Sequence, residues 1–125
     1  MGSVEEYLMK KIGEEGAIHL TLIDPEKTNP ETAGKISVEA EKAGTKAILL
    51  GGSTVASSNQ VDLATQEIKK SVNIPLILFP GNVSGVSKFA DAMFFMSLLN
   101  SSNPYFIVDA QALATPIIKQ YGIET

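Results

Sequence analysis

The chain has 125 residues, of which 44% are hydrophobic and 19% are charged, so it has room for one domain with a sizeable core. A disordered chain is excluded, because disorder goes with low hydrophobicity and high net charge, whereas the net charge here is only −4. All ten basic residues are lysine. The clustered basic face on which nucleic-acid binding depends is therefore not expected, and a phosphate site must use backbone N–H groups, lysine or a metal ion.

The sequence also bears on where the protein resides. It has no cysteine, so disulfides, thiolate zinc sites and cysteine nucleophiles are excluded, and an intracellular protein is the default expectation. The N-terminal segment MGSVEEYLMKK carries acidic residues where a signal peptide needs a basic segment followed by an apolar run. No run of about 18 apolar residues predicts a membrane-spanning helix. We therefore expect a soluble, cytoplasmic protein.

Strand and helix signals alternate along the chain. Apolar residues at helical spacing predict a first helix over residues 3–15. Short apolar segments bounded by proline, glycine or asparagine predict four strands, at residues 17–23, 46–50, 75–79 and 92–97. The segments between and after them predict helices from Asn29-Pro30 to Gly44, from Ser57 or Ser58 through Ile68, over 84–90, and from Asn103-Pro104 towards Gly122. Pro116 is expected to kink the last helix or to end it early.

Four consecutive strand–helix units predict an α/β fold with a parallel sheet, in a single domain over residues 1–125. Two architectures fit this order. The length of the chain suits an open flavodoxin-like sheet with helices on both faces. The same units also fit the N-terminal half of a (βα)8 TIM-type barrel, which needs about 250 residues in all.

Polar residues follow the predicted strands, at the edge where parallel α/β proteins bind ligands. Asp24 ends the first strand and precedes a proline, so its carboxylate can bind a hard cation such as Mg²⁺; an Asx-type turn is the alternative. The segment Gly51-Gly52-Ser53 can bring backbone N–H groups close to an anion and offer a hydroxyl to a metal or a phosphate. Its alternative interpretation is an ordinary tight turn.

Three further polar segments have simpler interpretations. Lys27 can face a phosphate, although a lone lysine is more often a solvated surface charge. His19 is the only histidine and is expected to pack with a hydrogen bond. Gly81-Asn82 is typical of a turn. With no Ser/His/Asp set in view, the residues favour metal-assisted handling of a phosphorylated, partly apolar substrate over hydrolysis.

Taken together, the four strand ends resemble the first half of geranylgeranylglyceryl phosphate synthases, which are (βα)8-barrel prenyltransferases of archaeal ether-lipid synthesis. The matching segments are HLTLIDPEK at 19–27, AILLGGS at 47–53, IPLILFPGNVSGVS at 74–87 and FFMSLLNSSNPYFIVDAQ at 94–111. The resemblance implies transfer of a geranylgeranyl group from its diphosphate to sn-glycerol 1-phosphate, with Mg²⁺ bound by Asp24 and Ser53. It also implies that an apolar barrel wall surrounds the prenyl chain.

The chain departs from the family pattern in its second half. The glycerol-phosphate motifs of the family are a Tyr-Leu stretch, a Gly-Gly-Gly loop and a final Gly-Asn, and none of them occurs before Thr125. We therefore expect a half-barrel that is incomplete for activity and that associates with a second copy or with the other half. Peripheral contact with a membrane is a further expectation, and a stand-alone phosphate-binding α/β module is the alternative function.

Overall fold

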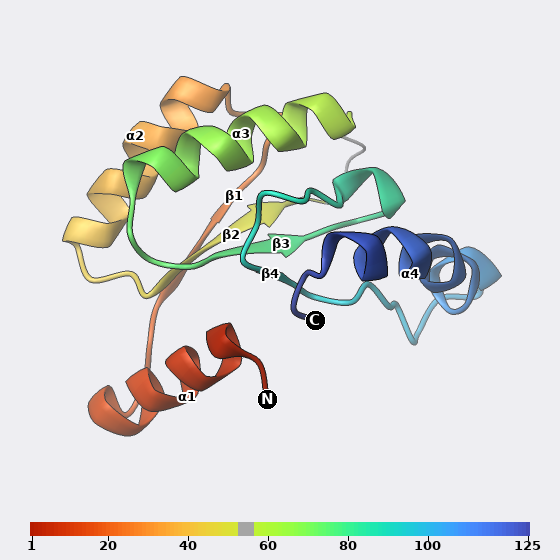
Figure 1. Cartoon of the computed structure of the whole chain (residues 1–125), viewed down its shortest axis with the longest axis horizontal. Coiled ribbons are helices and arrows are strands. Elements are labelled where there is room, and N and C mark those ends of the chain that lie inside the picture. The colour runs from red at the N-terminus through yellow and green to blue at the C-terminus, as the bar shows by residue number, and fades with distance from the viewer. Residues whose placement is uncertain (53–56) are drawn as a thin grey trace.

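Four parallel strands form one sheet in the computed structural model, which describes residues 1–52 and 57–125. The strands are β1 (Leu20–Ile23), β2 (Ala47–Gly51), β3 (Leu76–Phe79) and β4 (Ala92–Met93). Each strand pairs in parallel with the one before it, so the order across the sheet is β1-β2-β3-β4 (Figure 1).

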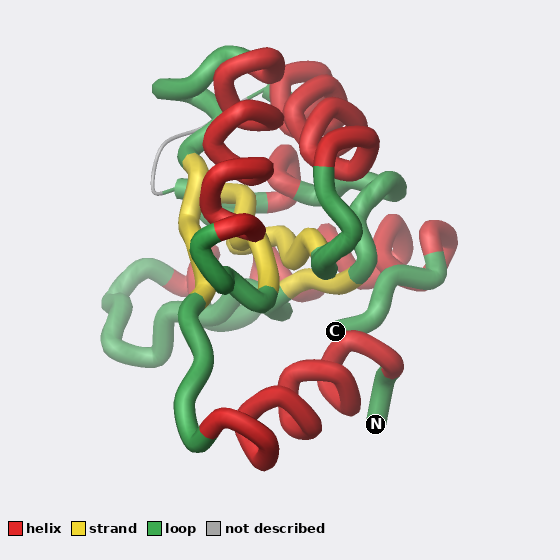
Figure 2. Tube along the Cα trace, turned by 90° about the vertical axis from the view of Figure 1, so that its left-hand side faces the viewer, coloured by secondary structure: helices red, strands yellow, loops and turns green. Residues whose placement is uncertain are grey.

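Helices cover the two faces of this sheet unequally. They are α1 (Ser3–Glu15), α2 (Pro30–Lys42), α3 (Ser58–Ser71) and α4 (Asp109–Tyr121), with short 3₁₀ turns η1 (Val83–Gly85) and η2 (Pro104–Phe106). The helices α2 and α3 lie side by side on one face of the sheet, whereas α1 lies on the opposite face (Figures 1 and 2). Within the described residues, no helix combines the length and the apolar character needed to cross a bilayer.

The strand order decides between the two predicted architectures. A flavodoxin-like sheet reverses its strand order at a switch point and carries helices on both faces. Here every strand neighbours its predecessor, and the crossover helices α2 and α3 share one face. Glu124 continues the same order, because it forms a parallel bridge with Ala92 beside β4. The fold is the N-terminal half of a TIM-type (βα)8 barrel, and the flavodoxin-like alternative is wrong.

Two predicted side-chain caps fix the starts of the crossover helices. The Asn29 side chain accepts a hydrogen bond from the Thr32 N–H at 2.8 Å, and Pro30 occupies the first position of α2. At α3, Ser57 and Gln60 form a reciprocal capping box. Each such cap contributes about 1 kcal/mol to helix stability, so both crossovers begin where the sequence predicts.

The main core lies between the sheet and the crossover helices. Its largest fully buried apolar side chains come from β2, β3 and α3: Ile48, Leu50, Ile68, Leu76 and Leu78. Burying a side chain of this size completely contributes about 1.5–3 kcal/mol. The run AILL in β2 is buried or half-buried at every position, which confirms a strand packed on both faces.

The opposite face of the sheet is only partly covered. At the amino ends of the strands, Val4 of α1 packs on Ala47, Ile77 and Ala92. Towards the carboxyl ends, the side chains of Leu22, Phe79 and Phe94 are 54%, 47% and 46% exposed. In a complete barrel this face is the interior, which side chains from all eight strands fill. The uncovered apolar face is therefore where half a barrel differs most from a complete one.

Two predicted strands are longer than the observed ones. The first starts at Leu20 rather than residue 17, and the fourth ends at Met93 rather than residue 97. After Phe94 the chain leaves the sheet, because the Met96 carbonyl accepts a hydrogen bond from the Gln111 side chain at 2.5 Å. The residues that follow β4 thus pair with η2 and α4 instead of extending the sheet.

The last two predicted helices are also corrected. Over residues 84–90 the chain forms only the 3₁₀ turn η1, so the predicted helix there is wrong. Asn103 caps the 3₁₀ turn η2, and α4 itself begins at Asp109. Pro116 lies inside α4 without ending it. The proline cannot donate a hydrogen bond to the Ala112 carbonyl, but Ala112 is exposed, so water can replace that donor.

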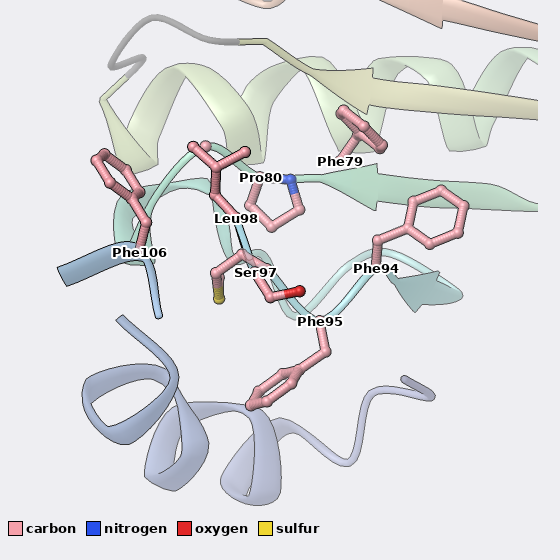
Figure 3. Close-up of a pocket in the computed structure, with 9 residues that line it drawn as sticks. Phe79, Pro80, Phe94, Phe95, Ser97, Leu98 and Phe106 are labelled. Carbon is pink, nitrogen blue, oxygen red and sulfur yellow. The ribbon is translucent and has the colours of Figure 1, made fainter. Parts of the chain in front are cut away.

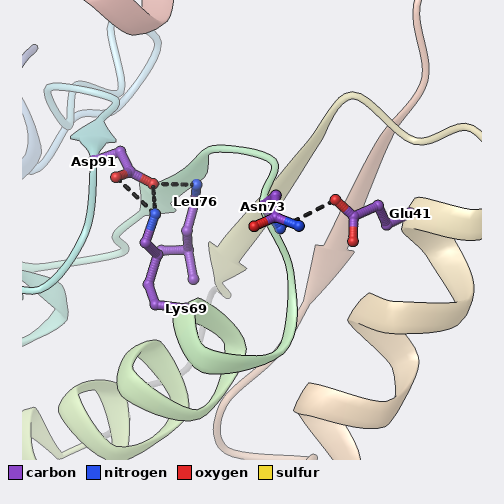
Figure 4. Close-up of polar contacts among 5 residues, drawn as sticks. All are labelled: Glu41, Lys69, Asn73, Leu76 and Asp91. Carbon is purple, nitrogen blue, oxygen red and sulfur yellow. Dashed lines mark hydrogen bonds and ion pairs between the residues drawn. The ribbon is translucent and has the colours of Figure 1, made fainter.

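Ionic and polar contacts join elements at the amino end of the sheet (Figure 4). The Asp91 carboxylate pairs with the Lys69 ammonium at 2.7 and 2.8 Å and accepts the Leu76 N–H at 2.7 Å. The Glu41 carboxylate accepts the Asn73 N–H at 3.1 Å. These contacts connect α2 and α3 to the start of β3 and to the segment before β4.

Glu124 ties the chain's last residues to its first helix. Its carboxylate accepts hydrogen bonds from the N–H groups of Val4 at 3.0 Å and Glu5 at 2.8 Å, and from the Ser3 hydroxyl at 3.4 Å. Burial raises the pKa of the Glu124 carboxyl, but these hydrogen bonds outweigh it and hold the pKa below its usual value. The two ends of the chain consequently lie close together (Figure 2).

Candidate functional site

The register of β1 and β2 brings two predicted site segments to the same edge of the sheet. Ile23 pairs with Leu50, so Asp24, the next residue, lies level with Gly51 and close to Gly52. The contact is direct: a Cβ atom built on Gly52 would lie 2.8 Å from Oδ2 of Asp24. The carboxylate and the Gly-Gly segment therefore meet at the carboxyl edge, as the sequence predicts.

The Asp24 carboxylate uses its two oxygens differently. Oδ1 accepts the Glu26 N–H at 3.0 Å, which is the Asx-type turn that the sequence left as an alternative. Oδ2 lies 3.7 Å from the Lys27 Nζ and faces Gly52. The Asp24 side chain is 22% exposed, whereas the Lys27 side chain is 76% exposed. The turn thus holds the carboxylate in place and leaves one oxygen available to a ligand.

Ser53, the second predicted metal ligand, lies outside the described residues. Gly52 is the last described residue before it, and Gly52 contacts the Asp24 carboxylate. The sharing of a cation between Asp24 and Ser53 stays a prediction.

Gly51 has a structural reason to be glycine. A Cβ atom there would collide with the backbone carbonyl of Phe79, its partner on β3. Its φ of 158° also lies outside the range that other residues usually adopt. At Gly51 the tight approach of two strands explains the residue without any ligand.

A small cavity lies next to this carboxyl edge. Its walls are mostly glycine and turn residues, and its volume is about 20 Å³. Gly51 and Gly52 form one side, and Pro80, Gly81 and Asn82 form the other. Asn82 caps the 3₁₀ turn η1 by accepting the Ser84 N–H at 2.9 Å, which confirms the predicted turn. The space is enough for about one water-sized group.

A larger, apolar cavity of about 400 Å³ continues from the same wall (Figure 3). It shares Pro80 and Gly81 with the small cavity. The rings of Phe79 and Phe94 meet edge to face, with their centroids 5.4 Å apart. Leu98 and Phe106 line the other end of the cavity, and Phe95 points towards α4. A volume of this size is typical of a small-molecule pocket.

Sequence reasoning expected apolar walls but did not identify these aromatic residues. The signal available was the run Phe94-Phe95 directly after β4, where a strand end carries aromatic rather than polar side chains. Phe106 gives no such signal, because it joins the cavity only when the segment after β4 folds back. The Phe106 carbonyl accepts the Leu98 N–H at 3.0 Å and so closes that loop.

Lys27 and His19, the two other candidate residues of the sequence, both have a polar partner in the structure. Lys27 pairs with Asp24 instead of standing free. His19 precedes β1, at the amino edge, and its Nδ1 lies 2.8 Å from the Thr45 hydroxyl. That hydroxyl also lies 2.8 Å from the Thr21 hydroxyl. The predicted hydrogen bond of His19 is confirmed, and its place away from the carboxyl edge removes it from the candidate site.

The donor set at the site suits a hard cation held partly by substrate. Among residues 1–52 and 57–125, no group of three or more histidine and carboxylate side chains is placed to hold a metal ion. Asp24 supplies one carboxylate oxygen that the turn does not use. Mg²⁺ is often bound in this way, by one or two carboxylates with water and phosphate oxygens completing its shell. The described residues therefore fit Mg²⁺ better than a metal that needs a full protein cage.

The chain matches the model of the PcrB family over residues 9–125. It is 52% identical over 123 residues to the geranylgeranylglyceryl phosphate synthase of Thermofilum pendens, covering 98% of this chain and 48% of that protein. It is 53% identical over 121 residues to the synthase of the same name from Methanothermobacter marburgensis, covering 97% of this chain and 49% of that protein. The chain thus spans about half the length of the curated relatives it matches.

Two solved structures also match nearly the whole of this chain and about half of their own length. The wild-type GGGPS from Thermoplasma volcanium superimposes with a TM-score of 0.90 at 43% identity, covering 99% of this chain and 49% of that chain. The (S)-3-O-geranylgeranylglyceryl phosphate synthase from Thermoplasma acidophilum, in complex with sn-glycerol-1-phosphate, superimposes with a TM-score of 0.88 at 40% identity. Its coverage is also 99% of this chain and 49% of that chain.

Proposed function

Because the chain belongs to the PcrB family, we propose that it forms the first half of a prenyltransferase active site. The reaction joins the geranylgeranyl group of geranylgeranyl diphosphate to the 3-hydroxyl of sn-glycerol 1-phosphate. A C–O bond forms between the hydroxyl oxygen and the first prenyl carbon, and the bond from that carbon to the diphosphate oxygen breaks. The bonding electrons stay on the released diphosphate, and the hydroxyl proton passes to water. Family membership and the names of the relatives support this assignment.

One observation about the site carries the proposal. An apolar cavity of about 400 Å³ shares a wall with the glycine-lined edge that holds Asp24. A prenyl diphosphate has the same division, with an apolar tail and an anionic head. We place the tail against Phe79, Phe94 and Leu98, where each buried methylene contributes about 0.8 kcal/mol. The head then lies towards Gly81 and Gly52.

The head group requires charge compensation in a chain that has no arginine. We assign Mg²⁺ to Oδ2 of Asp24 and the Ser53 hydroxyl, with diphosphate and water oxygens as the other ligands. When bound, Mg²⁺ supplies electrostatic stabilisation of the charge that develops on the departing diphosphate. Lys27, 3.7 Å from Oδ2 and largely exposed, is within reach of the same head group.

Three further proposals concern the second substrate, association with another chain, and the location of the protein. We place the sn-glycerol 1-phosphate site in the other half of the barrel, as the resemblance to the synthase family implies. The uncovered face of the sheet beside the cavity, where Leu22 is 54% exposed, is suited to association, either with the other half or with a second copy. We place the protein in the cytoplasm, with peripheral lipid contact at Leu99, which is 85% exposed beside the cavity residue Leu98.

Calorimetric titration with geranylgeranyl diphosphate tests the proposal. We expect binding that requires Mg²⁺ and that Asp24→Ala weakens by about tenfold or more, equivalent to ~1.4 kcal/mol. Glu26→Ala is the matched control, because Glu26 donates only its backbone N–H to Asp24. Equal binding with and without Mg²⁺, or by the wild type and Asp24→Ala, would overturn the assignment. Binding of small phosphates with no preference for the prenyl diphosphate would favour the stand-alone phosphate-binding module.

A further inference from the structure

The contact between Asp24 and Gly52 differs from the close contacts of two other glycines near the carboxyl edge, Gly51 and Gly85. The three atoms nearest to a Cβ built on Gly52 are Oδ2, Cγ and Oδ1 of Asp24, at 2.8, 2.9 and 3.2 Å. At Gly51 the obstacle is the backbone of Phe79, and at Gly85 it is Pro80. Of these three glycines, it is Gly52 that is kept free of a side chain by the carboxylate that we assign to the metal.

Backbone conformation does not explain the glycine at position 52. The glycines with positive φ are Gly16, Gly44, Gly51 and Gly122, and Gly52 is not among them. An L-residue can therefore adopt the backbone of Gly52 without the strain expected at a positive φ. What excludes a larger residue is the space that the Asp24 carboxylate occupies.

The carboxylate has little freedom to move away. Oδ1 is held by the Glu26 N–H at 3.0 Å, within a turn that the Asp24 carbonyl also stabilises by accepting the Thr28 N–H at 3.1 Å. A Cβ at position 52 requires a shift, because such atoms essentially never approach closer than 3.0 Å. Rotating the carboxylate to make room breaks the bond to Glu26 or turns Oδ2 away from the edge.

We propose that Gly52 is a positioning residue, whose missing side chain lets the Asp24 carboxylate present Oδ2 to the cation at the carboxyl edge. The metal part of this inference rests on the function proposed above. The contact itself does not, because it is a property of the chain without any ligand. The two parts are therefore separable by experiment.

The contact is tested by a double-mutant cycle on thermal unfolding. We expect Gly52→Ala to lower the unfolding midpoint by about 3–6 °C in the wild-type background. In the Asp24→Ala background the same substitution should change the unfolding midpoint by no more than about 1 °C relative to Asp24→Ala alone, because the carboxylate that obstructs the new Cβ is gone. An equal loss in both backgrounds overturns the proposal. If Gly52→Ala alone does not fold, recovery of a cooperative transition in the double variant supports it, and no recovery overturns it.

The positioning role is tested by measuring the affinity for Mn²⁺ in the presence of inorganic pyrophosphate. Electron paramagnetic resonance measures the free Mn²⁺ in each titration. We expect Gly52→Ala to weaken Mn²⁺ binding about tenfold, as substitutions that misorient a metal ligand do. Gly13→Ala is the control, since a Cβ there has no atom within 4 Å, and it should bind as the wild type does.

The outcomes separate this inference from the proposed function. Loss of Mn²⁺ binding in Asp24→Ala with wild-type affinity in Gly52→Ala leaves the function standing and overturns the positioning role. Equal Mn²⁺ binding by the wild type and Asp24→Ala overturns the metal assignment and the positioning role with it. In that case the unfolding cycle still decides whether the contact exists.

Discussion

The two ends of the sheet differ in what their polar groups do. At the amino end, charged side chains pair with one another and with backbone groups, as Asp91 does with Lys69 and Leu76 (Figure 4). At the carboxyl end, the described residues provide glycines, turns and half-exposed aromatic rings around two cavities that share Pro80 and Gly81 (Figure 3). The polar contacts at the amino end hold secondary-structure elements together, whereas the carboxyl end leaves room for a ligand.

This difference matches the general division of labour in (βα) barrels, where the amino end serves stability and the carboxyl end serves function. It has a direct consequence for substitutions. Changes at the amino end should lower stability without affecting ligands, and changes at the carboxyl end should affect ligand binding more than they affect stability. The predictions below test that separation, and the first one names an exception to it.

Gly51→Ala should have the largest effect on stability, although Gly51 lies at the carboxyl end of β2. The new Cβ would collide with the Phe79 carbonyl on the neighbouring strand, and neither backbone can move without breaking the pairing. We expect a loss of about 3 kcal/mol or more in the free energy of unfolding. Urea denaturation measures it. Gly13→Ala is the control and should gain about 0.5–1 kcal/mol, so equal stabilities for the two variants would contradict the strand contact.

Asp91→Ala should have the next largest effect on stability. It removes the partner of the Lys69 ammonium, whose side chain is 33% exposed, and the acceptor for the N–H of the fully buried Leu76. We expect a loss of about 2 kcal/mol in urea denaturation. Asp91→Asn keeps an acceptor for Leu76 and should lose about half as much. Mn²⁺ affinity should not change in either folded variant, and a parallel fall in affinity would contradict the separation of the two ends.

Phe94→Ala should affect binding more than stability. The ring is 46% exposed and meets Phe79 edge to face, so its loss should cost about 1 kcal/mol of stability. Affinity for geranylgeranyl diphosphate should fall about tenfold, because the ring lines the cavity assigned to the tail. Inorganic pyrophosphate, which has no tail, is the control ligand. An equal loss of affinity for both ligands would place the tail elsewhere.

Glu124→Gln should have the smallest effect, and it should depend on pH. The hydrogen bonds from α1 hold the pKa of Glu124 below its usual value of 4.5 despite the opposing effect of burial. A carboxyl with a lowered folded-state pKa adds stability above its unfolded pKa and loses it as the pH falls through the folded value. The variant should therefore be about 0.5 kcal/mol less stable at pH 7. The difference should narrow below pH 4.5, and a difference that grows there would contradict this account.

The fold was predictable where local signals and long-range packing agree. The caps at Asn29 and Ser57 and the apolar run of β2 indicate the same elements that the structure contains. The fourth strand was predicted too long, because the apolar residues 92–96 suit a sheet and a cavity wall equally well. Hydrogen bonds from Gln111 and to Phe106 withdraw that segment from the sheet, and sequence spacing does not reveal such contacts.

The last helix was misjudged for a related reason. Helical spacing places Phe106, Ala110, Leu113 and Ile117 on one stripe. Ala110 is buried as that stripe predicts, but Leu113 is 59% exposed, and the other buried positions of α4 are Ala114 and Ile118. The stripe was placed by counting from Phe106, which belongs to η2 and not to α4. A break of two residues between the two turns shifts the buried face, and that break leaves no clear sequence signal.

The candidate site was predictable in part. Parallel register alone brings the residue after β1 next to the residues after β2, so the contact of Asp24 with the Gly-Gly segment follows from topology. The reason for glycine at position 52 does not follow, because it depends on the rotamer of Asp24. The role of Phe106 does not follow either, because Phe106 reaches the cavity only through the loop that its hydrogen bond with Leu98 closes.

The central claim is that one cation joins Asp24 to Ser53 at the carboxyl edge, against a diphosphate. Anomalous diffraction from crystals grown with Mn²⁺ and pyrophosphate measures this directly. The account predicts a single strong peak about 2.1 Å from a carboxylate oxygen of Asp24 and from the Ser53 hydroxyl, with a pyrophosphate oxygen on the same ion. A peak that touches neither residue, or one bound by Asp24 with Ser53 out of reach, would contradict it.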